Sequence, residues 1–248
     1  MRYEGQIAET VTIRGHGGYP LVAYLARPFG AGPYANVLVI HHGVGWDEAT
    51  KEITRRFAHH GYIAICPNLY AREGADLSPD DAAAAARGKN GVPDEQFLGD
   101  VAGAIAYMRD LPTSNQKVGT IGYCSGGRQS FLAACNLDVQ AAVDCYGGFV
   151  AEPLPEEYKH LNMRPILDQA RNLRCPLLGL FGVEDKHPAP EHVKATEEEL
   201  KKQGKAFDFH TFEGAGHGFF ATDRAAYRVE AANEGWKLIF DFFGRYLA

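Results

Sequence analysis

Basic clusters and long apolar runs are both missing from this sequence. Its 248 residues carry a formal net charge of −6, with acids and bases interspersed along the chain. Without a basic patch to neutralise phosphates, nucleic acid is not expected as a partner. No apolar run approaches the ~20 residues of a membrane span, and the N-terminus lacks the apolar core of a signal peptide. We therefore expect a cytoplasmic protein with no membrane partner.

Cysteines are few, and their arrangement excludes two common uses. Their number is odd, and no spacing among them matches a zinc motif. A chain of this length buries enough apolar surface to fold without disulfides. We therefore expect no metal site and no disulfide framework, but reduced thiols at Cys66, Cys124, Cys135, Cys145 and Cys175.

Strand-like and helix-like segments alternate from residue 35 onward. Strands are expected at 35–40, 62–66, 118–121, 141–145, 176–181 and 206–212, and helices at 49–60, 94–110, 126–134, 191–202 and 224–246. Several strands are continuous apolar runs, which is typical of a sheet covered on both faces. The alternation predicts an α/β fold with a mostly parallel, doubly wound sheet flanked by helices. Residues 6–27 are expected to add antiparallel strands, and residues 1–248 to form a single domain.

Two stretches interrupt this alternation. Residues 71–93 contain an alanine run that favours a helix, and residues 149–173 are rich in proline and glutamate. Both follow expected strands, so both could overhang the edge where open α/β sheets bind ligands. We treat each segment as a candidate insert or lid.

The run VGTIGYCSGGRQS (118–130) combines a short strand, a glycine-rich turn and a helix. That order is typical of a nucleophile elbow, in which small neighbours allow a strained backbone turn. Gly122 and Gly126 place Cys124 at the centre of the turn. The N-terminus of the following helix would favour the Cys124 thiolate. The alternative is a buried cysteine in a glycine-rich turn.

A cysteine nucleophile needs a base, and the base needs an orienting group. In sheets with a nucleophile elbow, the acid and then the histidine follow the nucleophile along the chain. The loop GVEDKHP after the strand at 176–181 offers Glu184 and Asp185, and Asp185 lies one step further into the loop. His217 stands between two glycines after the last strand. We therefore predict Cys124, Asp185 and His217 as the catalytic residues.

Two backbone N–H groups are needed to stabilise the oxyanion of an acyl-transfer reaction. One is expected from Ser125, directly after the nucleophile, and the other from Gly43 in the loop HHGVGWDE after the strand at 35–40. His42 in that loop could face the site or merely flank the turn. Tyr146 could line the pocket or pack in the core. Both are predicted as substrate-binding residues.

Three motifs make the sequence resemble the dienelactone hydrolase family of α/β-hydrolases: CPNLYARE (66–73), KVGTIGYCSGG (117–127) and FEGAGHGFF (212–220). The resemblance extends from about residue 35 to residue 245. It implies the α/β-hydrolase fold, a Cys-Asp-His triad at Cys124, Asp185 and His217, and no metal or organic cofactor. The best-known members open a dienelactone ring, so the resemblance implies that the substrate is a small ester or lactone and that the reaction passes through a covalent acyl-enzyme.

Some positions differ from the well-studied members of that family. Those members have a glutamate where this chain has His42, and they hold the substrate carboxylate with arginines. Here Ala221 and Thr222 follow the catalytic histidine, and Arg87 lies beyond the alanine run. The expected function is a cysteine hydrolase of small esters or lactones, acting as a monomer or homodimer, with its substrate left open. A general carboxylesterase, a hydrolase of another activated acyl bond and a thiol-redox protein are the alternatives.

Overall fold

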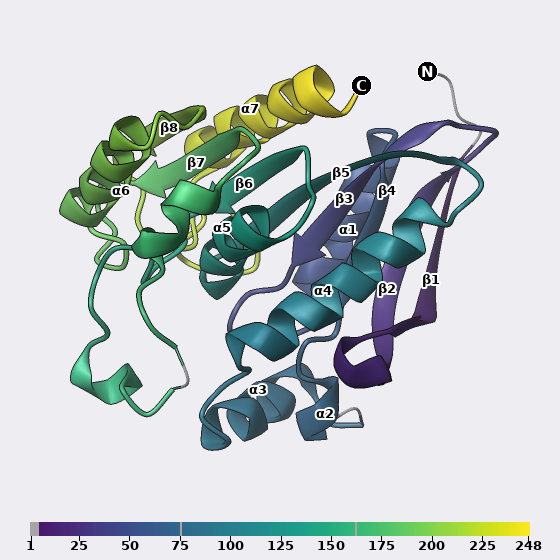
Figure 1. The fold of residues 1–248 in the computed structure, drawn as a ribbon, viewed down its shortest axis with the longest axis horizontal. Helices are drawn as coiled ribbons and strands as arrows, with labels where there is room; N and C mark the ends of the chain where they lie inside the picture. Colours follow the sequence, from purple (N-terminus) through teal and green to yellow (C-terminus); the bar gives the residue numbers. More distant parts are fainter. Residues whose placement is uncertain (1–4, 75, 162) are drawn as a thin grey trace. The chain divides into compact units, whose positions relative to one another are not determined.

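The computed structural model describes residues 5–74, 76–161 and 163–248, in which strands and helices alternate along most of the chain (Figure 1). The strands are β1 (Gly5–Arg14), β2 (Pro20–Phe29), β3 (Tyr34–Ile40), β4 (Ile63–Pro67), β5 (Ser114–Tyr123), β6 (Ala141–Cys145), β7 (Leu177–Gly182) and β8 (Phe207–Phe212). The α-helices are α1 (Glu48–His59), α2 (Ala71–Gly74), α3 (Pro79–Gly88), α4 (Asp94–Arg109), α5 (Ser125–Asn136), α6 (Pro190–Lys202) and α7 (Val229–Leu247). Short 3-10 turns are η1 (His16–Gly18), η2 (Glu156–Tyr158) and η3 (Leu167–Asn172).

Hydrogen bonds join the strands in the order β1-β2-β4-β3-β5-β6-β7-β8. The β1–β2 and β2–β4 pairs are antiparallel, whereas the β3–β4, β6–β7 and β7–β8 pairs are parallel. Parallel neighbours require crossover connections, and in this chain helices supply them. The predicted α/β fold with a mostly parallel sheet is confirmed, as are the antiparallel strands predicted within residues 6–27.

Contacts divide the described chain into two compact units. The first contains the residues up to Gly119 together with Tyr158–Met163, and the second contains Thr120–Glu157 and Arg164–Ala248. In the first unit, α1 packs on β2 and β4, while α4 packs on β1, β3 and β4. Figure 1 shows α4 in front of these strands and α1 behind them. In the second unit, α5 packs on β6, and α7 packs on β6 and β7.

The helical spacing predicted for residues 94–110 is confirmed by burial. Phe97, Val101, Ile105 and Met108 on α4 are all buried. Each lies three or four residues from the next, so together they form the single apolar stripe that packs a helix onto a sheet.

A buried ion pair explains part of the CPNLYARE motif. Asp100 on α4 is fully buried, and Arg72 on α2 donates hydrogen bonds to its two carboxylate oxygens at 2.6 and 2.8 Å. The backbone N–H of His16 donates to the same carboxylate at 2.8 Å, and the Arg72 guanidinium lies 4.3 Å from the ring centroid of Tyr19. Removing one partner of a buried pair costs about 3–5 kcal/mol. Arg72 therefore ties α2 and α4 to the turn between β1 and β2.

The two segments that interrupt the alternation contain short helices. Residues 71–93 include α2 and α3, and the alanine run lies within α3, as the propensity of alanine predicts. Residues 149–173 include η2 and η3. A lid function for either segment stays a prediction, as does the assignment of residues 1–248 to one domain.

The last helix starts later than the sequence pattern indicates. The expected start is residue 224, but α7 begins at Val229. Arg228 before it has an extended backbone, and its guanidinium donates to the carbonyl of Gly214 at 3.0 Å. The residues before Arg228 form consecutive turns, in which the backbone N–H of Arg224 donates to the carbonyl of Ala221. A side chain bound to a distant loop therefore sets this boundary.

Candidate active site

Cys124 lies at the junction of β5 and α5, where the chain turns sharply. Its φ of 57° and ψ of −123° place it in a backbone region that residues other than glycine rarely adopt. The Cys124 N–H donates a hydrogen bond of 3.1 Å to the carbonyl of Cys145 on β6, which holds the turn. The Cys124 side chain is partly exposed. Strain that the surrounding structure must maintain is concentrated at functional sites, and the conformation fits the predicted nucleophile elbow.

Glycines allow the backbone to close around this turn. A Cβ at Gly122 would collide with the carbonyl of Gly126, so the strand end and the start of α5 make direct backbone contact. A Cβ at Gly127 would lie 2.8 Å from the backbone of Gly147 and would collide with the Asp144 carboxylate. A side chain at either position would push α5 away from the neighbouring strand.

Asp185 lies three residues beyond the end of β7, in the loop that was predicted to supply the orienting acid. Its side chain is 2% exposed, and its Oδ2 lies 2.9 Å from Nδ1 of His217. Its Oδ1 accepts a hydrogen bond of 2.9 Å from the backbone N–H of His187. Glu184, the alternative, is exposed. The structure therefore pairs Asp185, and not Glu184, with the histidine.

His217 connects Asp185 to Cys124. Since a carboxylate only accepts hydrogen bonds, Nδ1 of the ring donates to Asp185, which leaves Nε2 for the hydrogen bond with the Cys124 side chain. Burial alone would lower the pKa of His217, but the hydrogen bonds with Asp185 and Cys124 outweigh it and raise this pKa to about 10. The three predicted residues thus form one hydrogen-bonded series within the second unit. Their catalytic function stays a prediction.

Tyr146 packs against the histidine of this series. Its side chain is buried, and its ring centroid lies 5.1 Å from that of His217 in an edge-on arrangement. The centroids of the Phe219 and Tyr123 rings lie 5.2 and 6.2 Å from that of Tyr146. Tyr146 therefore supports His217 as part of an aromatic cluster, and its predicted contact with substrate stays a prediction.

The other four cysteines differ from Cys124 in their surroundings. All four are buried, and none of the five takes part in a disulfide. Burial raises the pKa of Cys135 and of Cys175 to about 12, and it also raises that of Cys145. A thiol with a raised pKa carries little thiolate at neutral pH and reacts slowly. Cys124 is the cysteine whose position suits chemistry.

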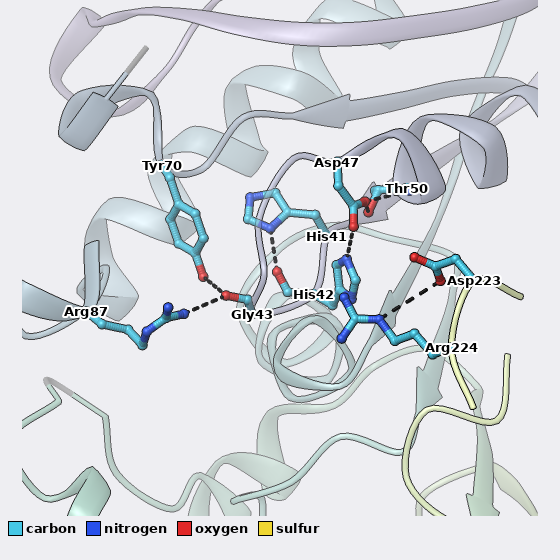
Figure 2. A network of polar contacts seen from close by, with 9 residues as sticks. All are labelled: His41, His42, Gly43, Asp47, Thr50, Tyr70, Arg87, Asp223 and Arg224. Carbon is cyan, nitrogen blue, oxygen red and sulfur yellow. Dashed lines mark hydrogen bonds and ion pairs between the residues drawn. The ribbon is translucent and has the colours of Figure 1, made fainter. Parts of the chain in front are cut away.

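His41, in the first unit, is a structural residue. It is buried, and its Nε2 accepts a hydrogen bond of 3.2 Å from the backbone N–H of Leu69. Its Nδ1 donates to the carbonyl of His42 at 2.9 Å (Figure 2). Burial lowers the pKa of His41 to about 4. The ring is therefore neutral at pH 7 and joins the loop after β3 to the loop after β4.

His42 has a carboxylate partner that was not predicted from the sequence. Its Nε2 lies 2.6 Å from Oδ2 of Asp47, as Figure 2 shows. Oδ1 of Asp47 caps α1 by accepting hydrogen bonds from the backbone N–H and the hydroxyl of Thr50 at 2.9 and 2.7 Å. Burial opposes ionisation of Asp47, but the hydrogen bond with His42 and those with Thr50 hold its pKa well below its usual range. The available signal for this cap was an aspartate two residues before the predicted helix 49–60.

Gly43 follows His42 and is held through its carbonyl. That oxygen accepts hydrogen bonds from Nη1 of Arg87 at 3.2 Å and from the Tyr70 hydroxyl at 3.5 Å (Figure 2). Arg87 therefore supports the loop after β3 by binding the backbone carbonyl of Gly43. His42 and Gly43 belong to the first unit, and their predicted functions in binding substrate and the oxyanion stay predictions, as does that of Ser125. Arg224, in the second unit, lies 3.9 Å from Asp223 in an exposed ion pair.

Within the described ranges, no group of three or more histidine, cysteine, aspartate or glutamate side chains is arranged to hold a metal ion. The helices in the same ranges are all too short or too polar to cross a membrane.

The profile of the dienelactone hydrolase family matches residues 21–247. A protein of Methylorubrum extorquens, provisionally named a carboxymethylenebutenolidase, is 35% identical over 246 residues, which is 98% of this chain and 82% of that protein. The carboxymethylenebutenolidase of Pseudomonas putida is 29% identical over 232 residues, which is 91% of this chain and 92% of that protein.

Solved structures agree with this result. A crystal structure provisionally named a dienelactone hydrolase, from Klebsiella pneumoniae, has a TM-score of 0.86 and 30% identity, and the match covers 98% of this chain and 100% of that one. A dienelactone hydrolase-like promiscuous phosphotriesterase from metagenomic libraries shares the fold, with a TM-score of 0.77 at 18% identity and coverage of 98% and 100%. Since the family profile and these relatives span nearly the whole sequence, the chain belongs to the dienelactone hydrolase family.

Proposed function

We propose that this hydrolase-family protein acts on carboxylic ester bonds of small esters or lactones by acyl transfer to Cys124. The observation that carries the proposal is the series of hydrogen bonds from Asp185 to His217 to Cys124, with the cysteine at a strained strand-to-helix turn. A nucleophile, a base and an orienting carboxylate in contact are the minimum for nucleophilic catalysis.

Acylation starts from the thiolate–imidazolium pair, in which the Cys124 proton lies on Nε2 of His217. The thiolate sulfur then attacks the substrate carbonyl carbon, and a C–S bond forms. Negative charge moves to the carbonyl oxygen, where the backbone N–H of Ser125 at the start of α5 is the proposed donor. When the C–O bond breaks, His217 returns its proton to the leaving oxygen. In a lactone that oxygen stays attached to the acyl group, so the ring opens.

Deacylation uses the same groups in reverse order. His217 takes a proton from a water molecule, and the hydroxide attacks the thioester carbon. The C–S bond breaks, the acid leaves, and the Cys124 thiolate is restored beside the protonated His217. Asp185 accepts the hydrogen bond from Nδ1–H throughout, so that Nε2 remains the ring nitrogen that exchanges protons and the imidazolium is stabilised.

The alternatives share Cys124 but differ in what they need around it. A general carboxylesterase would use the same steps and would prefer aryl or alkyl esters over lactones. A thiol-redox protein would need a resolving cysteine that can form a disulfide with Cys124. Cys145, whose carbonyl binds the Cys124 N–H, is fully buried with a raised pKa, which disfavours that use.

A substrate panel tests the proposal. We expect steady-state hydrolysis of at least one member of a set of small lactones and aryl acetates. Protein treated with iodoacetamide should be inactive, because alkylation blocks the sulfur of Cys124. Among the residues described, Cys124 is the cysteine whose side chain is hydrogen-bonded to His217. Relative rates on lactones and aryl esters then separate a lactonase from a general esterase.

A single release of product equal to the amount of protein, with no later turnover on any substrate, would contradict the proposal. So would full activity after complete alkylation of Cys124.

A further inference from the structure

Glu152 places a carboxylate where the fold does little to stabilise it. Its side chain is 2% exposed, and neither of its oxygens accepts a hydrogen bond from the described residues. A buried carboxylate without hydrogen bonds is unfavourable unless a positive charge lies close to it. Stability therefore does not explain why a glutamate occupies position 152, because an alanine or leucine would be buried at lower cost.

Two imidazoles lie beside this carboxylate. Nδ1 of His187 is 3.6 Å from Oε1, and Nδ1 of His192 is 3.6 Å from Oε2. Nδ1 of His192 already accepts a hydrogen bond of 3.2 Å from the backbone N–H of Ala189 at the start of α6. His187, whose ring is half exposed, is therefore the imidazole able to present a protonated nitrogen to Glu152.

A second buried carboxylate, that of Asp144, interacts with Glu152. Asp144 on β6 accepts a hydrogen bond of 2.7 Å from the Gly147 N–H. Burial, with a smaller contribution from the charge of Glu152, raises the pKa of Asp144 to about 7. The Asp144 and Glu152 carboxylates therefore lie close enough for their charges to interact.

His187 is connected directly to the acid of the proposed triad. Its backbone N–H donates to Oδ1 of Asp185, whose Oδ2 binds His217. Its carbonyl packs so closely on Gly148 that a Cβ there would lie 3.0 Å from it and 3.5 Å from Oε1 of Glu152. The Phe149 ring also lies beside the His187 ring, with 5.6 Å between their centroids. Residues 148–152 thus hold His187 at both its backbone and its ring.

We propose that Glu152 is a positioning residue: its carboxylate holds the ring of His187, so that the His187 N–H keeps Asp185 oriented toward His217. The proposal rests on the proposed function of the Cys124–His217–Asp185 series. It assigns residues 148–152, at the start of the candidate lid 149–173, a function in supporting the acid loop. It also explains why a buried charge is present: the residue serves the geometry of the site and not the stability of the core.

The test compares Glu152→Gln, His187→Ala and the double variant by two readouts. Glu152→Gln keeps the shape but removes the charge, and His187→Ala removes a half-exposed ring, so both should fold. We expect each single variant to lower kcat by about tenfold or more with KM changed less than about threefold, since small displacements of positioning groups have effects of this size. The rate of iodoacetamide alkylation of Cys124 at pH 7 should fall by at least about threefold in each. The double variant should be no worse than either single one.

Stability and a matched control separate positioning from a structural effect. The Tm of Glu152→Gln should stay within about 3 °C of the wild type or rise, because a buried charge is lost. Arg164→Ala, an exposed change in the same segment, should alter neither readout. Wild-type kcat and alkylation in Glu152→Gln and His187→Ala would overturn the proposal, as would losses that add up in the double variant or that accompany a clear fall in Tm. Alkylation needs no substrate, so it still tests Glu152 if the proposed hydrolase activity is not found.

Discussion

Cys124→Ala should abolish hydrolysis, with kcat falling by about 10⁴-fold or more, as when the nucleophile of a comparable triad is removed. The reason is that no other described side chain combines a thiol, partial exposure and a hydrogen bond with His217. The measurement is kcat on the best substrate of the panel, with the far-UV circular dichroism of each variant as a check of folding.

Cys124→Ser and Ser125→Ala extend this test to the neighbouring residues. Serine at 124 should also lose most activity, because its hydroxyl ionises far less readily than a thiol and the His217–Asp185 pair is arranged around a thiolate. Ser125→Ala should be mild, because only the backbone N–H of that residue is used. The opposite ranking, with Ser125→Ala inactive and Cys124→Ser active, would assign the nucleophile to Ser125.

Asp185→Asn should lower kcat by about 10⁴-fold, the size seen when the carboxylate of a serine triad is replaced by its amide. An asparagine in place of Asp185 can donate to Nδ1 of His217, which favours the tautomer with its proton on Nε2, where the base is needed. The hydrogen bond with Asp185 is also the main cause that raises the pKa of His217. Without it the pKa of His217 falls, and the thiolate–imidazolium pair becomes less favourable at neutral pH.

The pH dependence of Cys124 alkylation should shift in a defined direction in this variant. In the wild type the imidazolium is held up to about pH 10, so alkylation of Cys124 should already be fast at pH 7. In Asp185→Asn the rise of the alkylation rate should move to higher pH. Glu184→Gln is the matched control: the neighbouring carboxylate is exposed and should affect neither kcat nor the alkylation profile. Equal losses in the two variants would contradict the assignment of Asp185.

Local patterns were enough to predict most of the fold. The apolar run before His41 and the stripe on α4 both report burial directly, because a strand or helix buries residues at its own period. Boundaries set by distant contacts were not visible in this way. The start of α7 coincides with the hydrogen bond from Arg228 to the carbonyl of Gly214, and the link between α2 and α4 is the ion pair of Arg72 with Asp100.

The candidate site also combines features visible in local sequence with contacts between distant segments that are not. The glycine frame around Cys124 and the order of the three residues along the chain are local features, and the structure brings those residues together. The choice of Asp185 over Glu184 followed from loop position and agrees with the observed pairing. Pairings that join distant segments, such as Glu152 with His187, have no sequence signature because each residue alone resembles an ordinary loop residue.

The central claim is that an acyl group passes through the sulfur of Cys124. The most direct test is to mix the protein with an aryl acetate, quench in acid within the first turnovers, and locate the added acetyl mass by peptide mass spectrometry. An acetyl-thioester should be found on the peptide that contains Cys124, should disappear as hydrolysis is completed, and should be absent in Cys124→Ala. Acetyl on Ser125, or turnover that continues with no adduct and survives Cys124→Ala, would contradict the account.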